Sequence, residues 1–154
     1  ICSCSQKNDN AKILAPSFID SIIKNSDSSY NKSYYRTDFV TASYYTNKKD
    51  STVCQLMKDS AGIIRQIIIA KKEVRIFYGS YYKNGQLQAS LPLDTFGQYH
   101  GRGSFYYEDG SLQSSGNYNH GFKAGAWQVY DRKGKVTATD SYDNNGNLIP
   151  QKMP

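Results

Sequence analysis

The residues that could perform acid–base or metal chemistry in this chain are few and scattered. His100 and His120 are its two histidines, and each lies beside a glycine where a hairpin is expected to end. This favours a role as turn residues over one as ligand or general base. Cys2 and Cys4 form a pair, but no second Cys or His pair with zinc spacing follows. We therefore expect no enzyme, cofactor or metal site; a hydrolase would need histidines or carboxylates to converge in a pocket.

Nucleotide and nucleic-acid binding have little support in the sequence. No G-x-x-x-x-G-K-[ST] motif occurs, and Gly101-Arg102-Gly103 lacks the strand-to-helix setting that a phosphate loop requires. Tyrosines interleaved with lysine and arginine could stack bases, yet no recognisable nucleic-acid motif accompanies them. We expect no nucleic-acid partner.

The elements that must position any site come from a repeated unit. The stretch YYKNGQLQAS, which begins at Tyr81, returns as YYEDGSLQSS, which begins at Tyr106. A weaker copy follows around Gly134, and a fainter one precedes around Gly62. The full copies carry Asn-Gly or Asp-Gly between strand-forming residues, a signature of β-hairpins whose turns need positive φ. Such recurrence is typical of a repeat architecture.

In these copies the sequence resembles the bacterial variant of the MORN (membrane occupation and recognition nexus) repeat, with a pattern near G-x-W-x-x-Y-x-x-x-G-x-L-x-x-x-G-x-Y-x-x-G-x-x-x-G. The second copy carries the pattern at Gly101, Tyr106, Gly110, Leu112, Gly116, Tyr118, Gly121 and Gly125, and Trp127 opens the third. The first copy departs from it, because Leu91-Pro92-Leu93-Asp94 replaces Gly-x-Tyr, which leaves the path of that hairpin open. The resemblance implies a hairpin-repeat fold and, among known members, antitoxin-like or immunity-type proteins.

The expected fold is mainly β: an antiparallel meander of consecutive β-hairpin, MORN-like repeats that forms an elongated sheet with one short N-terminal helix. Isoleucines at helical spacing predict a helix at about 16–24, and the Ser/Asn/Asp-rich stretch 25–32 predicts a loop. The aromatic and β-branched residues from Tyr34 to Tyr45 predict one strand. The apolar run 63–69 should lie centrally or beneath the helix. We expect a polar tether at 1–11 and a single domain at 12–154, with the MORN-like repeats at about 76–148.

The charge and the N-terminal residues suggest a location and a kind of partner. A formal net charge of +6 weakly favours an acidic partner, although it also serves solubility. Ile1-Cys2-Ser3-Cys4 resembles the end of a bacterial lipoprotein signal, so Cys4 would carry lipid and hold the domain at the cell envelope. The alternative is that Cys4 is an ordinary cysteine.

The expected binding surface is a row of tyrosines on one face of the sheet. Tyr81, Tyr106 and Tyr130 each lie four residues before a turn glycine, on the face opposite Phe105 and Trp127. We expect them to be exposed and to act as contact residues. The basic residues expected around them are Lys83, Arg102, Lys123 and Arg132. If the tyrosines instead pack in the core, the interface should lie at the hairpin ends or on the N-terminal half.

Two functions from different classes remain open on this sequence. The first is a non-enzymatic protein-binding module of the bacterial cell envelope; the most concrete version that the resemblance implies is an immunity protein or antitoxin that neutralises a secreted toxin. The second is a structural or membrane-surface module that binds anionic lipid or glycan.

Overall fold

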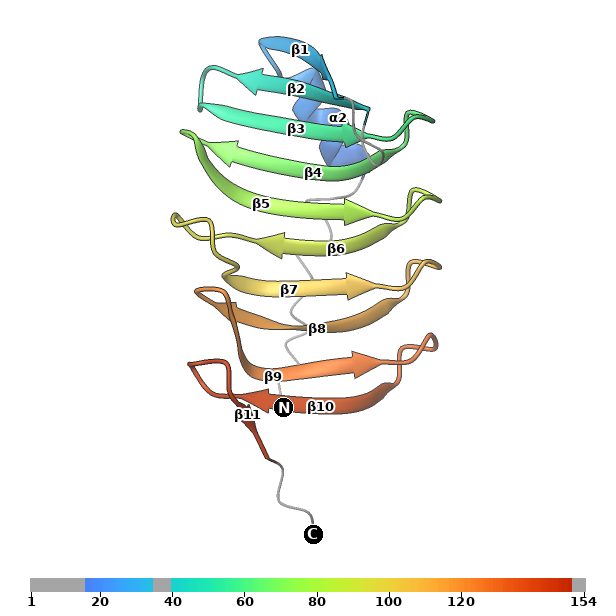
Figure 1. The fold of residues 1–154 in the computed structure, drawn as a ribbon, viewed down its shortest axis with the longest axis vertical. Coiled ribbons are helices and arrows are strands. Elements are labelled where there is room, and N and C mark those ends of the chain that lie inside the picture. Colours follow the sequence, from blue (N-terminus) through green and yellow to red (C-terminus); the bar gives the residue numbers. More distant parts are fainter. Residues whose placement is uncertain (1–15, 35–39, 151–154) are drawn as a thin grey trace, which may run out of the picture.

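The computed structural model describes residues 16–34 and 40–150 of the chain. In these residues one 11-stranded sheet runs from β1 to β11 in the order of the sequence, and each strand is antiparallel to the next (Figure 1). The strands are β1 Ser28–Ser33, β2 Thr41–Asn47, β3 Thr52–Lys58, β4 Ile64–Lys71, β5 Val74–Tyr81, β6 Leu87–Pro92, β7 Gly101–Tyr106, β8 Leu112–Asn119, β9 Phe122–Tyr130, β10 Val136–Tyr142 and β11 Leu148–Ile149. The expected meander of hairpins is confirmed.

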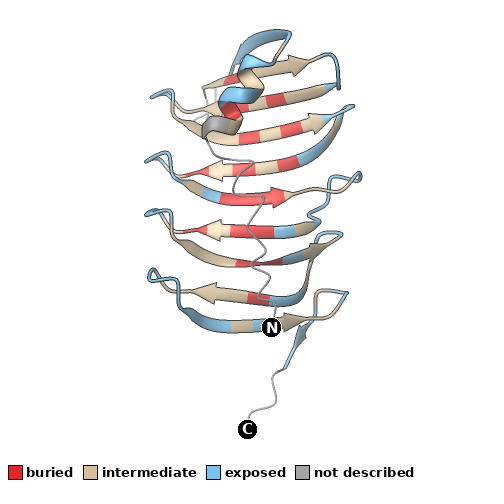
Figure 2. Cartoon of the chain, turned by 180° about the vertical axis from the view of Figure 1, so that it is seen from behind, coloured by how far each residue is buried: buried red, intermediate tan, exposed pale blue. Residues whose placement is uncertain are grey.

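The helix α2 spans Pro16–Lys24 and covers one face of the sheet near β3, β4 and β5 (Figure 2). Proline suits the first helical position because its missing N–H would have no partner there. The buried core beneath α2 is built from its Ile19 and from strand residues whose side chains all point to the same face of the sheet. These strand residues are Cys54, Leu56, Ile67, Ile69, Phe77 and Tyr81. The expectation that the run 63–69 lies beneath the helix is confirmed.

Strand pairing divides the sheet into a helix face and an open face. Residues that pair across neighbouring strands point to the same face. Leu56 pairs with Ile67, and Ile67 pairs with Gly79. These residues form a row on the helix face, which continues through Ser90 into β7. The neighbouring row, which starts at Gln55, lies on the other side, which we call the open face. No helix in the described part of the chain covers the open face, which is turned toward the viewer in Figure 1.

On the open face, large aromatic rings lie over glycines of the adjacent strand. A Cβ atom on Gly116 would come within 2.4 Å of the Trp127 indole, and one on Gly103 within 2.8 Å of the Tyr118 ring. The indole Nε1–H of Trp127 donates a hydrogen bond to the Asn117 carbonyl at 3.0 Å. These glycines are therefore required for space, since neither has the positive φ of the turn glycines.

One turn geometry recurs in most of the connections. In the β7–β8 turn the Tyr107 N–H donates to the Ser111 carbonyl and the Gly110 N–H to the Tyr107 carbonyl, both at 2.9 Å. The same pair of bonds begins at Asp59, Tyr82, Asp94, Asp131 and Asp143. The corresponding glycines, at positions 62, 85, 97, 110, 134 and 146, all have φ between 77° and 84°. The expectation that turn glycines adopt positive φ is confirmed.

Two local expectations differ from the structure, and one open question is answered. Residues 25–32, expected as a loop, contain most of β1, because β2 offers an unpaired edge to this polar stretch. The strand expected from Tyr34 to Tyr45 begins at Thr41, and residues 35–39 lie outside the described residues. The open question at Leu91-Pro92-Leu93-Asp94 is settled: β6 continues to Pro92, and a Leu93–Tyr99 bridge follows within the β6–β7 connection.

Candidate functional site

The tyrosines expected to form an exposed row are largely buried, so this expectation is wrong. Tyr81 and Tyr106 are only 8% and 9% exposed, whereas Tyr130 is half-buried. As expected, the three tyrosines lie on the opposite face of the sheet from Phe105 and Trp127. That face, however, is the helix face. Tyr81 is part of the core beneath α2. Burial raises the pKa of the Tyr81 phenol to about 12 and also raises that of Tyr106.

The four expected basic residues do not converge either. Lys83 and Arg132 lie in the β5–β6 and β9–β10 turns, where Arg132 pairs with Asp109 of the neighbouring turn. The Arg102 guanidinium donates to the Ser115 hydroxyl at 2.9 Å. The Lys123 ammonium lies on the open face, 4.5 Å from the centre of the Trp127 ring. Cys4, the expected lipidation position, lies outside the described residues.

A different group of side chains forms where two connections meet at the opposite ends of the strands from the β5–β6 and β9–β10 turns. We call this the loop edge: it carries the connections β2–β3, β4–β5, β6–β7, β8–β9 and β10–β11, on the left in Figure 1. The β6–β7 connection is the longest of them, and the β8–β9 turn docks on it, because the Gly121 N–H donates to the Tyr99 carbonyl at 2.8 Å. Two segments distant in sequence are thereby fixed side by side.

Beside this contact the open face is hollowed into a groove of about 680 Å³. Its floor comes from β4 and β5, through Ile68 and Tyr78, and its wall from the two docked connections. The groove is lined by Ile68, Arg75, Tyr78, Leu93, Gly97, Gln98, Tyr99, His120, Gly121 and Phe122. From the groove a row of aromatic rings continues across the open face. The ring centres of Tyr99 and Tyr118 are 5.3 Å apart, and those of Tyr118 and Trp127 are 4.9 Å apart.

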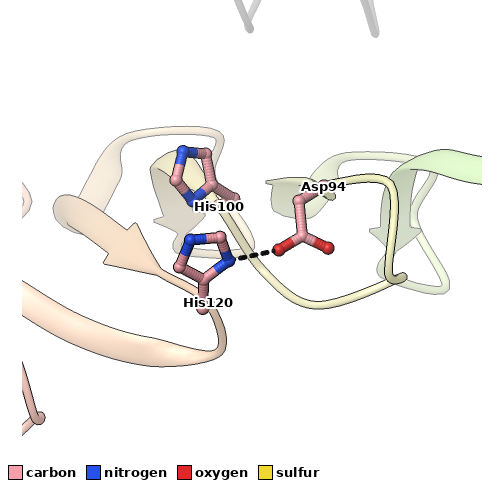
Figure 3. Close-up of side chains that lie close together, drawn as sticks. All are labelled: Asp94, His100 and His120. Carbon is pink, nitrogen blue, oxygen red and sulfur yellow. Dashed lines mark hydrogen bonds and ion pairs between the residues drawn. The ribbon is translucent and has the colours of Figure 1, made fainter.

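The two histidines and one carboxylate converge at the rim of this groove (Figure 3). His120 Nδ1 lies 2.7 Å from Asp94 Oδ2, and the ring centres of His100 and His120 are 4.9 Å apart. One ligand atom from each of the three side chains lies within 4.8 Å of the others. The sequence-based view of the histidines as separate turn residues is therefore incomplete: both are at hairpin ends, but the fold brings them together.

Hydrogen bonds hold Asp94 in its ionised form. Desolvation opposes ionisation, but the N–H groups of Gln98 and Phe96 and the ring of His120 outweigh it, so the pKa of Asp94 is lowered. Both N–H groups donate to Oδ1, at 3.0 and 2.9 Å, which leaves Oδ2 to His120. An ionised Asp94 accepts the Nδ1–H of His120, which fixes the orientation of the imidazole.

The sequence did contain a signal for this cluster. Asp94-Thr95-Phe96-Gly97 has the same Asp-x-x-Gly form as Asp131 to Gly134, so it marks an extra turn between β6 and β7. In a meander every second connection lies on the same edge, which would have placed this turn beside the β8–β9 turn and its His120. The expectation missed it because each histidine was considered with its own glycine only.

Similarity to known proteins is limited to the fold. No protein-family model and no curated protein matches this chain. Among solved structures, the crystal structure of a point mutant of S. aureus TarM in complex with Fondaparinux, alpha-GlcNAc-glycerol and UDP matches 84% of this chain at 20% identity, with a TM-score of 0.51. A second crystal structure of TarM matches 78% at 19% identity, with a TM-score of 0.50. This chain spans only 23% and 22% of those two chains, and the likeness concerns the fold alone.

Proposed function

We propose that this chain is a non-enzymatic protein-binding module whose partner docks at the groove on the loop edge. The observation that carries the proposal is the exposure of large aromatic side chains around that groove: Phe96 is 82% exposed, Phe122 57% and Tyr99 36%. Tyr99 and Phe122 line the groove, and Phe96 precedes its lining residue Gly97; exposed apolar side chains gathered in this way mark interaction sites. This agrees with the sequence-based alternative, in which buried tyrosines place the interface at the hairpin ends.

The groove also has the composition of a binding hot spot. Tyrosine and arginine are enriched where truncation costs most affinity, and Tyr78, Tyr99 and Arg75 line this groove. The backbone contact between Gly121 and Tyr99 holds the two walls in place before binding. A partner therefore loses little affinity to ordering these loops.

An acidic partner suits the charge of the neighbouring turns on the same edge. The β2–β3 turn carries Lys48 and Lys49, while Lys71 ends β4 and Lys72 begins the β4–β5 turn; all four are exposed. Asp50, Glu73 and Asp143 on this edge and the ionised Asp94 at the groove rim offset this charge in part, while Arg75 in the groove adds to it. Such a basic edge steers an acidic protein toward the groove and raises the association rate at low salt.

The experiment compares aromatic variants of the groove with a matched variant elsewhere. The chain is immobilised and exposed to envelope and secreted fractions of its source organism, and any stoichiometric partner is then titrated in pure form. Tyr99→Ser and Phe122→Ser should each weaken binding by about 2 kcal/mol, roughly thirtyfold in Kd. Val136→Ser is the control, because Val136 is also exposed but lies at the start of β10, next to the β9–β10 turn. Equal binding by all three variants would place the interface elsewhere.

The envelope location is part of this proposal and rests on Cys4. Full-length precursor expressed in a bacterium should partition into detergent, and Cys4→Ala should abolish that behaviour. An immunity or antitoxin role, implied by the MORN-like resemblance, predicts in addition that expression of the chain protects cells from one specific toxin. A precursor that remains in the aqueous phase argues against the anchor but leaves the groove proposal intact.

Anionic glycan is a second candidate ligand, favoured by the mixed lining of the groove. Aromatic rings of Tyr78 and Phe122 with polar groups from Arg75 and Gln98 are the kind of walls that bind a small polar ligand. The matched TarM structure contains Fondaparinux, alpha-GlcNAc-glycerol and UDP. Direct titration with Fondaparinux separates the two candidates: saturable binding lost in Arg75→Gln supports the glycan, whereas no binding beside a retained protein partner rejects it.

A further inference from the structure

We propose that Asp94, His100 and His120 form a binding site for a divalent transition metal ion such as Zn²⁺, which would clamp the β6–β7 connection to the β8–β9 turn. This inference is independent of the identity of any partner at the groove. It rests on the convergence of the three side chains from two connections, and not on any sequence motif (Figure 3).

The donor set is of the kind that zinc prefers. Two imidazole nitrogens and one carboxylate oxygen recur as ligands of Zn²⁺, with bonds of about 2.0–2.2 Å. Such bonds place ligand atoms of a tetrahedral site roughly 3.3 Å apart, and here they lie within 4.8 Å of one another. The widest separation must therefore shrink by up to about 1.5 Å, and the 2.7 Å between His120 Nδ1 and Asp94 Oδ2 must widen to about 3.3 Å when the ion enters. Because His100 and His120 are exposed, rotation of their side chains can supply this movement.

The backbone already holds the three residues in position for such a site. Asp94 is fixed by the two N–H groups that donate to Oδ1, which leaves Oδ2 pointing at His120. The His100 N–H donates to the Pro92 carbonyl at 3.0 Å, and Gly121 next to His120 is bonded to Tyr99. The His120 ring is already held by Asp94, so mainly the His100 ring remains to be ordered and the loss of entropy on binding is small.

His120 occupies a backbone conformation that most residues avoid. Its φ is +46°, in the left-handed region where asparagine, aspartate and histidine are enriched among non-glycine residues. This conformation directs its ring toward Asp94, across the junction of the two connections (Figure 3). A metal ion would take the place of the proton shared by Asp94 and His120 and recruit His100 as a third ligand. The remaining coordination positions would hold water beside the groove.

The test titrates Zn²⁺ alone into the full chain at pH 7.5, in a Cys2→Ser/Cys4→Ser background without a histidine tag so that no added ligand competes. We expect one equivalent to bind with micromolar or tighter affinity. His100→Ala, His120→Asn and Asp94→Asn should each weaken binding at least tenfold. Asparagine is chosen at position 120 because it tolerates positive φ, and at position 94 because its carbonyl keeps the turn hydrogen bonds.

Controls separate a built site from general metal uptake and from unfolding. Glu73→Gln, which removes an exposed carboxylate from the β4–β5 turn on the same edge, should leave Zn²⁺ affinity unchanged. Circular dichroism and the melting temperature without metal identify any variant that fails to fold. Bound Co²⁺ should give the visible absorption of a nitrogen- and oxygen-ligated ion only when both histidines are present. Uptake that persists in both histidine variants, or Zn²⁺ affinity weaker than millimolar in the parent chain, would overturn the proposal.

Discussion

The absence of a side chain at Gly116 leaves the space in which the Trp127 indole packs on the open face. The indole lies so close to the Gly116 backbone that even a methyl group cannot be added without displacing it. Trp127 is 2% exposed although it belongs to the face without a helix, because its ring packs on the Gly116 backbone and is also covered by Tyr118 and Lys123. Close packing of this kind makes the position intolerant of added volume.

We expect Gly116→Ala to destabilise the protein by about 1–3 kcal/mol, since the new methyl group forces the indole out of place. Chemical denaturation measures the change in the free energy of unfolding. In a Trp127→Ala background the same substitution should cost much less, because the clashing ring is gone. Additive effects of the two substitutions would show that the cost comes from the backbone of Gly116 and not from the indole.

At the scale of elements, the repeated turn depends on the left-handed conformation of its glycine. Gly110 and Gly134 have φ of 84° and 80°, yet their surroundings differ. A Cβ on Gly110 would lie 3.1 Å from the Gln86 amide oxygen, whereas one on Gly134 would meet nothing within 4 Å. The pair therefore separates backbone strain from crowding.

Gly110→Val and Gly134→Val should each lower the free energy of unfolding by more than about 1 kcal/mol, because a β-branched residue is strained at positive φ. Thermal and urea denaturation of both variants measure this. Similar losses identify backbone strain as the cause. A loss at Gly110 alone would instead assign it to the contact with Gln86.

Neighbouring turns on the edge opposite the groove are joined by contacts that recur with the repeat. The Tyr82 hydroxyl donates to the Tyr106 carbonyl at 2.8 Å, and the Tyr107 hydroxyl to the Tyr130 carbonyl at 2.9 Å. In the second of these junctions Arg132 donates to Asp109 at 2.7 Å and stacks on the Tyr107 ring. The hydroxyl and N–H of Ser111, followed by Arg132, lower the pKa of Asp109 to about 2.

This shift predicts a dependence of stability on acid. An aspartate has a pKa of about 4 in the unfolded chain, so its lower value in the folded state contributes stability that is present above pH 4 and lost between about pH 4 and pH 2. The difference in unfolding free energy between the parent protein and Asp109→Asn should therefore shrink over that range in urea titrations. Added salt should reduce the effect, because the pair is exposed.

The sequence predicted the hairpins because each turn has a glycine, which tolerates positive φ, between two runs of strand-forming residues. It predicted α2 because Ile19, Ile22 and Ile23 share one helical stripe. It failed for β1, where Ser28–Ser33 has no apolar alternation and forms a strand only because β2 is there to pair with it. It also failed to predict the burial of Tyr81 and Tyr106. The alternation of side chains along a strand assigns these residues to one face of the sheet, but it does not show which face is buried.

At the scale of the whole molecule, packing is strongest at one end of the sheet. The main contacts join strands adjacent in sequence, and the apolar core lies under α2 at β3, β4 and β5. Most residues of β10 and both residues of β11 are exposed. Stability in such an array is close to a sum over neighbouring units, and opening can be local.

Amide hydrogen exchange should therefore be slowest in β3 to β5 and fastest in the exposed end strands β1, β10 and β11. Exchange followed by mass spectrometry of peptides resolves these segments. Shortening the chain to end at Arg132 should leave protection in β3 to β5 nearly unchanged. Uniform protection from β2 to β10, or collapse of all protection on truncation, would indicate a single cooperative unit.

A sheet whose strands contact mainly their neighbours in sequence can gain or lose a hairpin without changes to the other hairpins. Duplication of one repeat in the gene would add two strands and extend the sheet by roughly 9–10 Å, at about 4.8 Å for each strand. The new junction would reuse the bond from a turn tyrosine to the carbonyl of the next tyrosine, so it would need no compensating mutation. The number of repeats thus sets the distance between the last strand and the helix-covered end of the sheet. Related chains could differ in reach while keeping the same surface chemistry.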